Sequence, residues 1–362
     1  MRSQSGLILA RNWLDRTGVC PLSFYLGPST RYADHNVIAA VTAHCTRWEE
    51  ITFDFPISCS EGLGVVKHRL PHLKNLVFNE ADPWLQSLDT FEVAPQLRSL
   101  ELCRGISIST LKLPWFQLTR CDLGSRCLEE CFQILKLCPS LIDVVFFKTC
   151  GPKLHASHDI LQHPHLQSIH ILSPINLHDF FDRLTLPALV DFTQCEGPSW
   201  GQHRQLMSLL KRSDCRLQKL YIATQPVRMI TEGDFIDMLE QTSSLVVLNL
   251  EGFAPVIRSY TWRRLTHRGS SRCLLPKLQT LRLSHTSDFI THAFVDMIES
   301  RWKFPSARGE AKNSQTQVVR LERCFLNILD GVKNVDPAVR ARLRNLRAEG
   351  LRIWPIDSEK GF

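Results

Sequence analysis

LPHLKNLVF, residues 70–78, decides the fold of this chain because its pattern of leucines returns again and again along the sequence. The shared frame is L-x-x-L-x-L, in which Ile, Val, Phe or Cys can replace the later leucines. The frame recurs as APQLRSLEL from Ala94, FQLTRCDL from Phe116, CPSLIDVVF from Cys138, HPHLQSIHI from His163, LPALVDFTQ from Leu186, CRLQKLYI from Cys215, SSLVVLNL from Ser243 and LPKLQTLRL from Leu275.

The spacing of these copies is typical of a leucine-rich repeat. The leading leucines first step by 21 to 25 residues, then by 28, 28 and 33. A period of about 20 to 29 residues is that of leucine-rich repeats. The leading leucines lie at 73, 97, 118, 141, 166, 189, 217, 245 and 278.

The frame also predicts how each copy folds. Its last two apolar residues are two apart, so they point to one face of a β-strand while the residue between them points to the other. One copy cannot bury its apolar face alone, so neighbouring copies are expected to stack into one core and one parallel sheet. We therefore predict an α/β leucine-rich-repeat solenoid of eleven or twelve units, closed by a C-terminal helical cap.

Helical segments are expected between the strands, on the outer side of the sheet, because parallel strands need crossover connections. Apolar residues at helical spacing, such as i, i+3, i+4 and i+7 in the first, predict three of them. They are Leu128, Cys131, Phe132 and Leu135 in the first; Phe235, Met238 and Leu239 in the second; and Phe289, Phe294 and Ile298 in the third. The positions three residues past the last apolar site hold no ladder of Asn, so we expect an irregular arc with uneven turns.

The chain is expected to divide into three parts. Residues 1–20 form an N-terminal helix or linker, and residues 21–330 form the repeat domain. Within that domain we expect a basic loop at 258–272 and a polar loop at 304–317. Residues 331–362 form the capping helix and a tail, with Asp336 as its N-cap, Pro337 as its first residue and Gly350 as its C-terminal stop.

The composition is that of a chain with a real core. Hydrophobic residues make up 44% and charged residues 22% of the 362 positions. No apolar run approaches the roughly 20 residues that span a bilayer. The 13 cysteines are scattered, and they form no CxxC pair. A reducing compartment, cytoplasmic or nuclear, fits such cysteines best, because there they act as small buried hydrophobes.

The clusters of histidine and cysteine have structural explanations that do not require a metal or catalytic site. Six histidines fall between His155 and His178, but they lack the paired spacing of zinc ligands. The cysteines at 121, 127, 131 and 138 are better explained as core residues. No nucleophile elbow, P-loop or dinucleotide motif occurs. We therefore predict no enzyme, no catalytic residue, no cofactor and no metal.

Net charge is +7, and six of the cations lie in residues 258–277, which contain no acid. This predicted loop mixes Tyr260 and Trp262 with five arginines: Arg258, Arg263, Arg264, Arg268 and Arg272. Arginine mixed with aromatic residues can bind and stack on nucleic acid. A solvated insertion, or a patch for an acidic protein, would have the same composition, so nucleic-acid binding is only the weaker alternative.

The concave face of the predicted sheet is the expected binding surface. Its side chains are those between the apolar sites of each strand: Glu101, Asp122, His170, Lys219, Tyr221, Asn249, Glu251 and Arg282. The same residues could equally be ordinary solvated surface, since exposed polar residues are the default.

The order of the motifs resembles a known family. NWLDRTGVCPLSFYL, HCTRWEEITFDF, the repeats beginning LPHLKNL, CPSLIDV and LPKLQTL, and the closing LRNLRAEGLRI resemble the F-box-like leucine-rich-repeat proteins of mushroom-forming fungi. The resemblance covers nearly the whole chain, from Leu9 to Ile353. It implies substrate recognition in an SCF (cullin-type) ubiquitin ligase, in which an N-terminal F-box binds the Skp adaptor and the repeats capture the target.

An F-box needs about 40 to 50 residues in that family, and eight residues precede Leu9. We expect the chain to lack an F-box, so the Skp adaptor is expected as a partner only if an F-box exists upstream. The alternative is a stand-alone scaffold or inhibitor built from the repeats. In either case we expect a monomer that binds a protein substrate.

Overall fold

A computed structural model describes most of the chain, which divides into two compact units, residues 1–157 and 158–362. The described residues are 2–27, 35–57, 62–80, 82, 85, 87–103, 105–150, 160–172, 177–197, 203–224, 230–253, 256–268, 273–285, 289–303, 318–328 and 335–354. The polar segment 304–317 therefore lies outside them. Each unit is described by itself.

Unit 1 holds six described strands in one parallel sheet, ordered along the sheet as they are along the chain. Its strands are β1 (Leu22–Leu26), β2 (Trp48–Phe53), β3 (Asn75–Phe78), β4 (Ser99–Leu102), β5 (Arg120–Cys127) and β6 (Asp143–Cys150). Its helices are α1 (Arg2–Arg16), α2 (His35–Thr42) and α3 (Leu128–Leu137).

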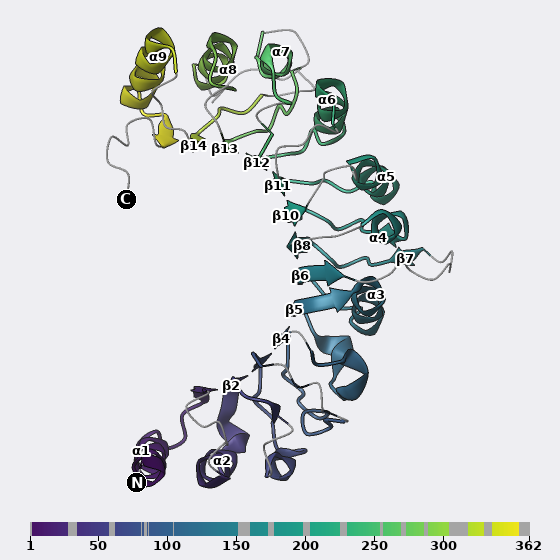
Figure 1. Ribbon diagram of the computed structural model, residues 1–362, viewed down its shortest axis with the longest axis vertical. Helices are drawn as coiled ribbons and strands as arrows, with labels where there is room; N and C mark the ends of the chain where they lie inside the picture. The colour runs from purple at the N-terminus through teal and green to yellow at the C-terminus, as the bar shows by residue number, and fades with distance from the viewer. Residues whose placement is uncertain are drawn as a thin grey trace, which may run out of the picture. The chain divides into compact units, whose positions relative to one another are not determined.

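Unit 2 holds seven described strands in a parallel sheet, and its helices lie along one side of that sheet (Figure 1). The strands are β8 (Ser168–Leu172), β10 (Asp191–Gly197), β11 (Lys219–Thr224), β12 (Val247–Glu251), β13 (Thr280–His285), β14 (Arg323–Ile328) and β15 (Arg352–Trp354). The helices are α4 (His178–Asp182), α5 (His203–Ser213), α6 (Glu232–Gln241), α7 (Ser259–Leu265), α8 (His292–Trp302) and α9 (Pro337–Ala348).

The repeating frame builds the core of both units as predicted. All nine leading leucines are buried, with at most 2% of their surface exposed. The two later apolar sites point inward on each strand, as Leu248 and Leu250 do on β12, while Asn249 between them stays half-exposed. The predicted parallel α/β sheet is therefore confirmed.

The connections differ more between repeats than the strands do. The predicted helices form at α3, α6 and α8, with their spaced apolar residues buried. Unit 1 instead uses short 3-10 turns between some strands, at Leu63–Val66, Ile108–Thr110 and Trp115–Gln117. A small parallel pair, β7 (Leu161–Gln162) with β9 (Leu184–Thr185), was not predicted.

Side chains other than Asn tie neighbouring repeats together. The amide of Gln117 donates to the backbone oxygens of Ala94 at 2.7 Å and Leu97 at 2.9 Å. The hydroxyl of Ser244 donates to the oxygen of Leu217 at 2.6 Å. These bonds satisfy carbonyls just before β4 and β11 and connect each strand to the neighbouring repeat.

One sequence prediction about the C-terminal half is corrected. Residues 258–272 are not simply a loop, because α7 begins at Ser259 and buries Thr261, Trp262 and Leu265. The structure also adds a strand that was not predicted, because β15 in the predicted tail pairs with β14. Leu351, just before β15, and Ile353 within it are both buried, so the segment has the alternating pattern of a strand with one buried face.

The predicted ends of α9 are confirmed. The carboxylate of Asp336 accepts a hydrogen bond from the Ala338 amide at 2.7 Å, and Pro337 opens the helix. Gly350 stops the helix in a left-handed conformation, with φ of 101°, which glycine adopts at little cost. No helix in the described part of the chain has both the length and the apolarity to cross a bilayer.

Candidate functional site

We define the open face of each unit as the side of its sheet to which the buried core residues do not point. In unit 1 one row of register partners on this face is Val77, Glu101, Asp122 and Val145. In unit 2 the corresponding row is His170, Thr193, Tyr221, Asn249, Arg282, Phe325 and Trp354. The predicted binding residues of each unit therefore do come together, with Lys219 and Glu251 one row to either side.

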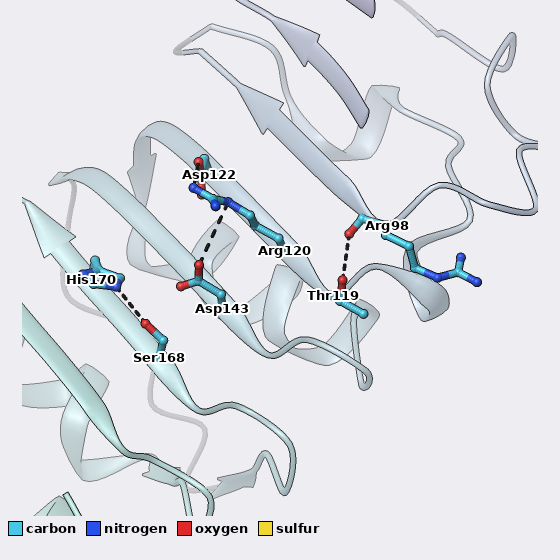
Figure 2. Close-up of polar contacts among 7 residues, drawn as sticks. All are labelled: Arg98, Thr119, Arg120, Asp122, Asp143, Ser168 and His170. Atoms are coloured by element: carbon cyan, nitrogen blue, oxygen red, sulfur yellow. Dashed lines mark hydrogen bonds and ion pairs between the residues drawn. The ribbon is translucent and has the colours of Figure 1, made fainter. Parts of the chain in front are cut away.

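The open face of unit 1 carries an ion-pair cluster on β5 and β6 (Figure 2). The guanidinium of Arg120 lies 2.9 Å from a carboxylate oxygen of Asp122 and 4.0 Å from one of Asp143. The hydrogen bond to Asp122 raises the pKa of Arg120. One guanidinium thus holds two carboxylates in place on adjacent strands.

Glu101 sits beside this cluster in the row that contains Asp122. Partial burial, and then the charge of Asp122, raise the pKa of the Glu101 carboxyl. The backbone just before these strands is tied by the hydroxyl of Thr119, which donates to the oxygen of Arg98 at 3.3 Å (Figure 2). This bond connects the chain segments that lead into β4 and β5, the strands that carry Glu101 and Asp122.

In unit 2 the predicted residues are fixed by contacts across the strands. The ammonium of Lys219 lies 3.1 Å from the carboxylate of Asp191, and the hydroxyl of Tyr221 donates to Glu251 at 3.1 Å. Burial raises the pKa of Tyr221, and the neighbouring Glu251 adds to this. The phenol therefore keeps its proton at neutral pH and acts as a donor.

His170 lies on the same face, at β8. Its Nε2 is 2.7 Å from the hydroxyl of Ser168, two residues earlier on the strand (Figure 2). The contact holds the imidazole along the strand, among the hydrogen-bonding groups of the face.

The end of the open face in unit 2 contains residues that sequence analysis missed. The guanidinium carbon of Arg282 lies 4.4 Å from the centroid of the Phe325 ring. Trp354, on the neighbouring strand β15, stacks on Phe325, with ring centroids 5.6 Å apart and planes 15° apart. The signal was in the sequence, because Phe325 stands between the inward residues Cys324 and Leu326.

The predicted basic patch lies elsewhere, on and beside α7. Trp262 is buried and packs edge-to-face on Phe294, with centroids 4.9 Å apart, so it cannot stack on a base. Arg264 is paired with Glu240 at 2.6 Å. Arg258, Arg263 and Arg268 are exposed, and Arg272 lies outside the described residues. Helix α7 is on the helical side of the sheet, so the patch is not part of the open face (Figure 1).

The cysteine and histidine clusters take structural positions where they are described. Cys121, Cys131 and Cys138 are buried in the core. A hydrogen bond with Cys138, and burial, raise the pKa of Cys121. His163 is buried, while His155 and His158 lie outside the described residues. No group of three or more metal-ligating side chains occurs among the residues that the structure covers.

A hollow of about 390 Å³ opens on the helical side of unit 2, at the C-terminal ends of α5 and α6. Its lining includes Lys211, Asp214 and Cys215. Burial raises the pKa of Cys215 to about 11, so this residue is a thiol at neutral pH. The hollow does not involve any of the predicted site residues.

Comparison with known proteins adds no family. No protein-family model matches the chain, and no curated protein matches it.

Proposed function

We propose that this chain is a leucine-rich-repeat recognition module that binds a protein partner on its open face. The main support is the alternation of inward and outward side chains along the strands. The inward set is mostly apolar and builds the core, with Gln194 on β10 as a polar exception, while the outward set is varied and held at fixed register positions. Such rows offer a partner many prearranged contacts, which lowers the entropic cost of binding.

We further propose that the module is the substrate-binding part of an SCF-type ubiquitin-ligase adaptor, as the family resemblance implies. Helix α1 offers a surface for a neighbouring domain, because Ile8 is 59%, Leu9 69% and Trp13 44% exposed. Exposed apolar clusters of this kind commonly mark interaction sites. In this proposal α9 and β15 cap the other end of the repeats.

A stand-alone scaffold or inhibitor is the second candidate, and it would use the same open face. Nucleic-acid binding at α7 has lost its main support, because Trp262 is buried and Arg264 has a carboxylate partner. Single-stranded nucleic acid is usually bound by exposed aromatic side chains beside a basic groove.

Co-purification separates the two candidates. The native protein is tagged at its C-terminus in its own cells, isolated, and probed for the Skp adaptor and the cullin. The ligase proposal expects both, and expects substitution of Leu9 and Trp13 by Ser to weaken their recovery. Recovery of a partner without either ligase component favours the scaffold.

Binding at the open face is tested by comparing substitutions on that face with matched substitutions on the helical side. Once a partner is identified, its affinity is measured with the variant Tyr221→Ala/Asn249→Ala and with the control Arg263→Ala/Lys211→Ala on the helical side. The proposal expects a loss of affinity of about tenfold or more in the first variant. Equal affinities for both variants would contradict it.

A further inference from the structure

We infer that one end of the open face in unit 2 binds an extended acidic segment of a protein partner through arginine and aromatic side chains. The surface, here called the arginine–aromatic platform, consists of Arg282, Arg323, Phe325, Arg352 and Trp354. The inference rests on the proposed function and deepens it by naming the chemistry of the partner.

Three strands place the platform side chains next to one another. Arg282, Phe325 and Trp354 are consecutive register partners on β13, β14 and β15, and Arg323 pairs with Arg352 two residues earlier. Phe325 therefore lies between the guanidinium of Arg282 and the ring of Trp354. A guanidinium that stacks on a ring keeps its N–H groups available in its own plane, where they can donate to a carboxylate.

The three arginines have no acidic partner among the described residues. Their side chains make no hydrogen bond or ion pair to another described residue, and the one contact of a guanidinium is the stacking of Arg282 on Phe325. Two other cations on the open faces do have acidic partners: Arg120 pairs with Asp122, and Lys219 pairs with Asp191. Among the described residues, the platform thus carries three arginines with no acidic partner, whereas Arg120 and Lys219 are paired.

The sheet also holds two of these charges side by side. Arg323 and Arg352 are direct register partners on neighbouring strands, which lie about 4.8 Å apart. Like charges in direct register destabilise a sheet. A bound anion between the two guanidinium groups would relieve this repulsion, because each carboxylate can accept hydrogen bonds from two donors at once.

The stacking favours a peptide over a nucleic acid. Phe325 has Arg282 on one side and Trp354 on the other, so only Trp354, which is 46% exposed, offers an open aromatic surface. Single-stranded nucleic acids need successive platforms for successive bases. One open indole beside three arginines instead suits a chain of carboxylates with an apolar side chain among them.

The test measures binding of labelled peptides to the whole chain by fluorescence anisotropy at low and physiological salt. The probe is a fluorescein-labelled peptide of six Glu-Ser pairs with one central Leu. Its comparators replace Glu by Gln, or carry phosphoserine in place of Glu, and a twelve-residue oligothymidylate is measured in parallel. The platform variant is Arg282→Gln/Arg323→Gln/Arg352→Gln. The control variant, Arg258→Gln/Arg263→Gln/Arg268→Gln, removes the same three charges near α7.

The inference expects the Glu peptide to bind the native chain, with an affinity that falls as salt rises. It expects the platform variant to lose at least about tenfold in affinity, since hydrogen bonds to charged groups are involved, and the control to change by less than about twofold. Circular dichroism confirms that both variants are folded. A variant with Trp354→Ala alone, expected to lose about threefold, tests the aromatic part separately.

Several outcomes would overturn the inference. They are no measurable binding of the Glu peptide, equal losses in the platform and control variants, binding of the phosphoserine peptide alone, and tighter binding of oligothymidylate that the platform variant abolishes. A native partner that contacts Asn249, yet binds the platform variant with unchanged affinity, would refute the platform and leave the proposed function standing.

Discussion

The guanidinium of Arg282 on β13 lies over the ring of Phe325 on β14, 4.4 Å from its centroid. The contact follows from the parallel register, which makes the two residues partners on neighbouring strands. Trp354 continues the same row on β15. The row joins three repeats through their exposed side chains, so it contributes to stability as well as to the surface that we propose for binding.

Substitution of Phe325 by Leu is expected to lower the free energy of unfolding by about 1 to 2 kcal/mol. The change removes one aromatic pair and one cation–π contact, each of which contributes about 1 kcal/mol. Urea denaturation measures the loss. The control is Phe147→Leu on β6, an exposed aromatic residue, for which we expect a change of less than about 0.5 kcal/mol. Equal effects of both substitutions would argue against the stacked row.

Adjacent positions on β12 are expected to respond very differently to alanine. Leu248 is 1% exposed, so Leu248→Ala should destabilise the chain by about 2 to 5 kcal/mol through lost burial and the cavity left behind. Asn249→Ala should change the free energy of unfolding by no more than about 0.5 kcal/mol. Thermal or urea unfolding distinguishes them, and the reverse order would contradict the assigned faces of the strand.

Arg301 on α8 is expected to be structural. Its guanidinium is fully buried and donates to the backbone oxygens of Leu265 at 2.7 Å and Leu275 at 3.0 Å, and also to that of Leu274. Arg301→Met would leave the carbonyls of Leu265 and Leu274 without this donor, while that of Leu275 would keep its bond from the Leu278 amide at 3.1 Å. At about 1 kcal/mol or more for each orphaned carbonyl, we expect a loss of about 2 kcal/mol or more.

Exposed Arg263 on α7 provides the control for Arg301, because Arg263→Met removes the same charge without uncovering any buried carbonyl. Its effect on the free energy of unfolding should stay within about 0.5 kcal/mol. If Arg301→Met proves neutral or stabilising, burial of the charge costs more than its hydrogen bonds return, and the structural role assigned to Arg301 is wrong.

Glu101 is expected to make stability depend on pH. Partial burial and Asp122 raise its pKa in the folded chain above the usual 4.5, so the folded state holds the proton to higher pH than the unfolded state does. Stability should therefore fall as pH rises from about 4.5 through the folded pKa. Glu101→Gln removes this loss.

The Gln variant should accordingly be more stable than the native chain at neutral pH, with a difference that disappears below about pH 4.5. Urea denaturation between pH 3.5 and 7 measures the difference at each pH. A difference that keeps its size at acid pH would show that Glu101 acts through packing and not through its charge.

The strands could be predicted from the sequence because each obeys one local rule. Leu248 and Leu250 alternate with less buried residues, as expected for a strand with one buried face, and this pattern recurs in the other copies. The connections follow no such rule. Residues 258–272 suggested a loop because their arginines are plentiful, but Thr261, Trp262 and Leu265 supply a buried face on a helix of seven residues.

The surface could be predicted only in part, for a physical reason. Alternation places Glu101, Asp122 and Tyr221 on the outward side, but it does not reveal which residues of neighbouring strands are register partners. The row of Arg282, Phe325 and Trp354 joins residues 43 and 29 positions apart in sequence, so it emerges only once the strands are paired. Strand β15 is three residues long, and so short a strand gives little signal.

The most direct test of the open-face claim is site-specific photo-cross-linking in the native cells. A photoreactive phenylalanine analogue is placed at Asn249 on the open face, or at Arg263 on the helical side, in otherwise identical full-length protein. The account predicts that one protein partner cross-links through position 249 and not through position 263. A partner that cross-links only through position 263 would contradict the claim that the open face is the binding surface.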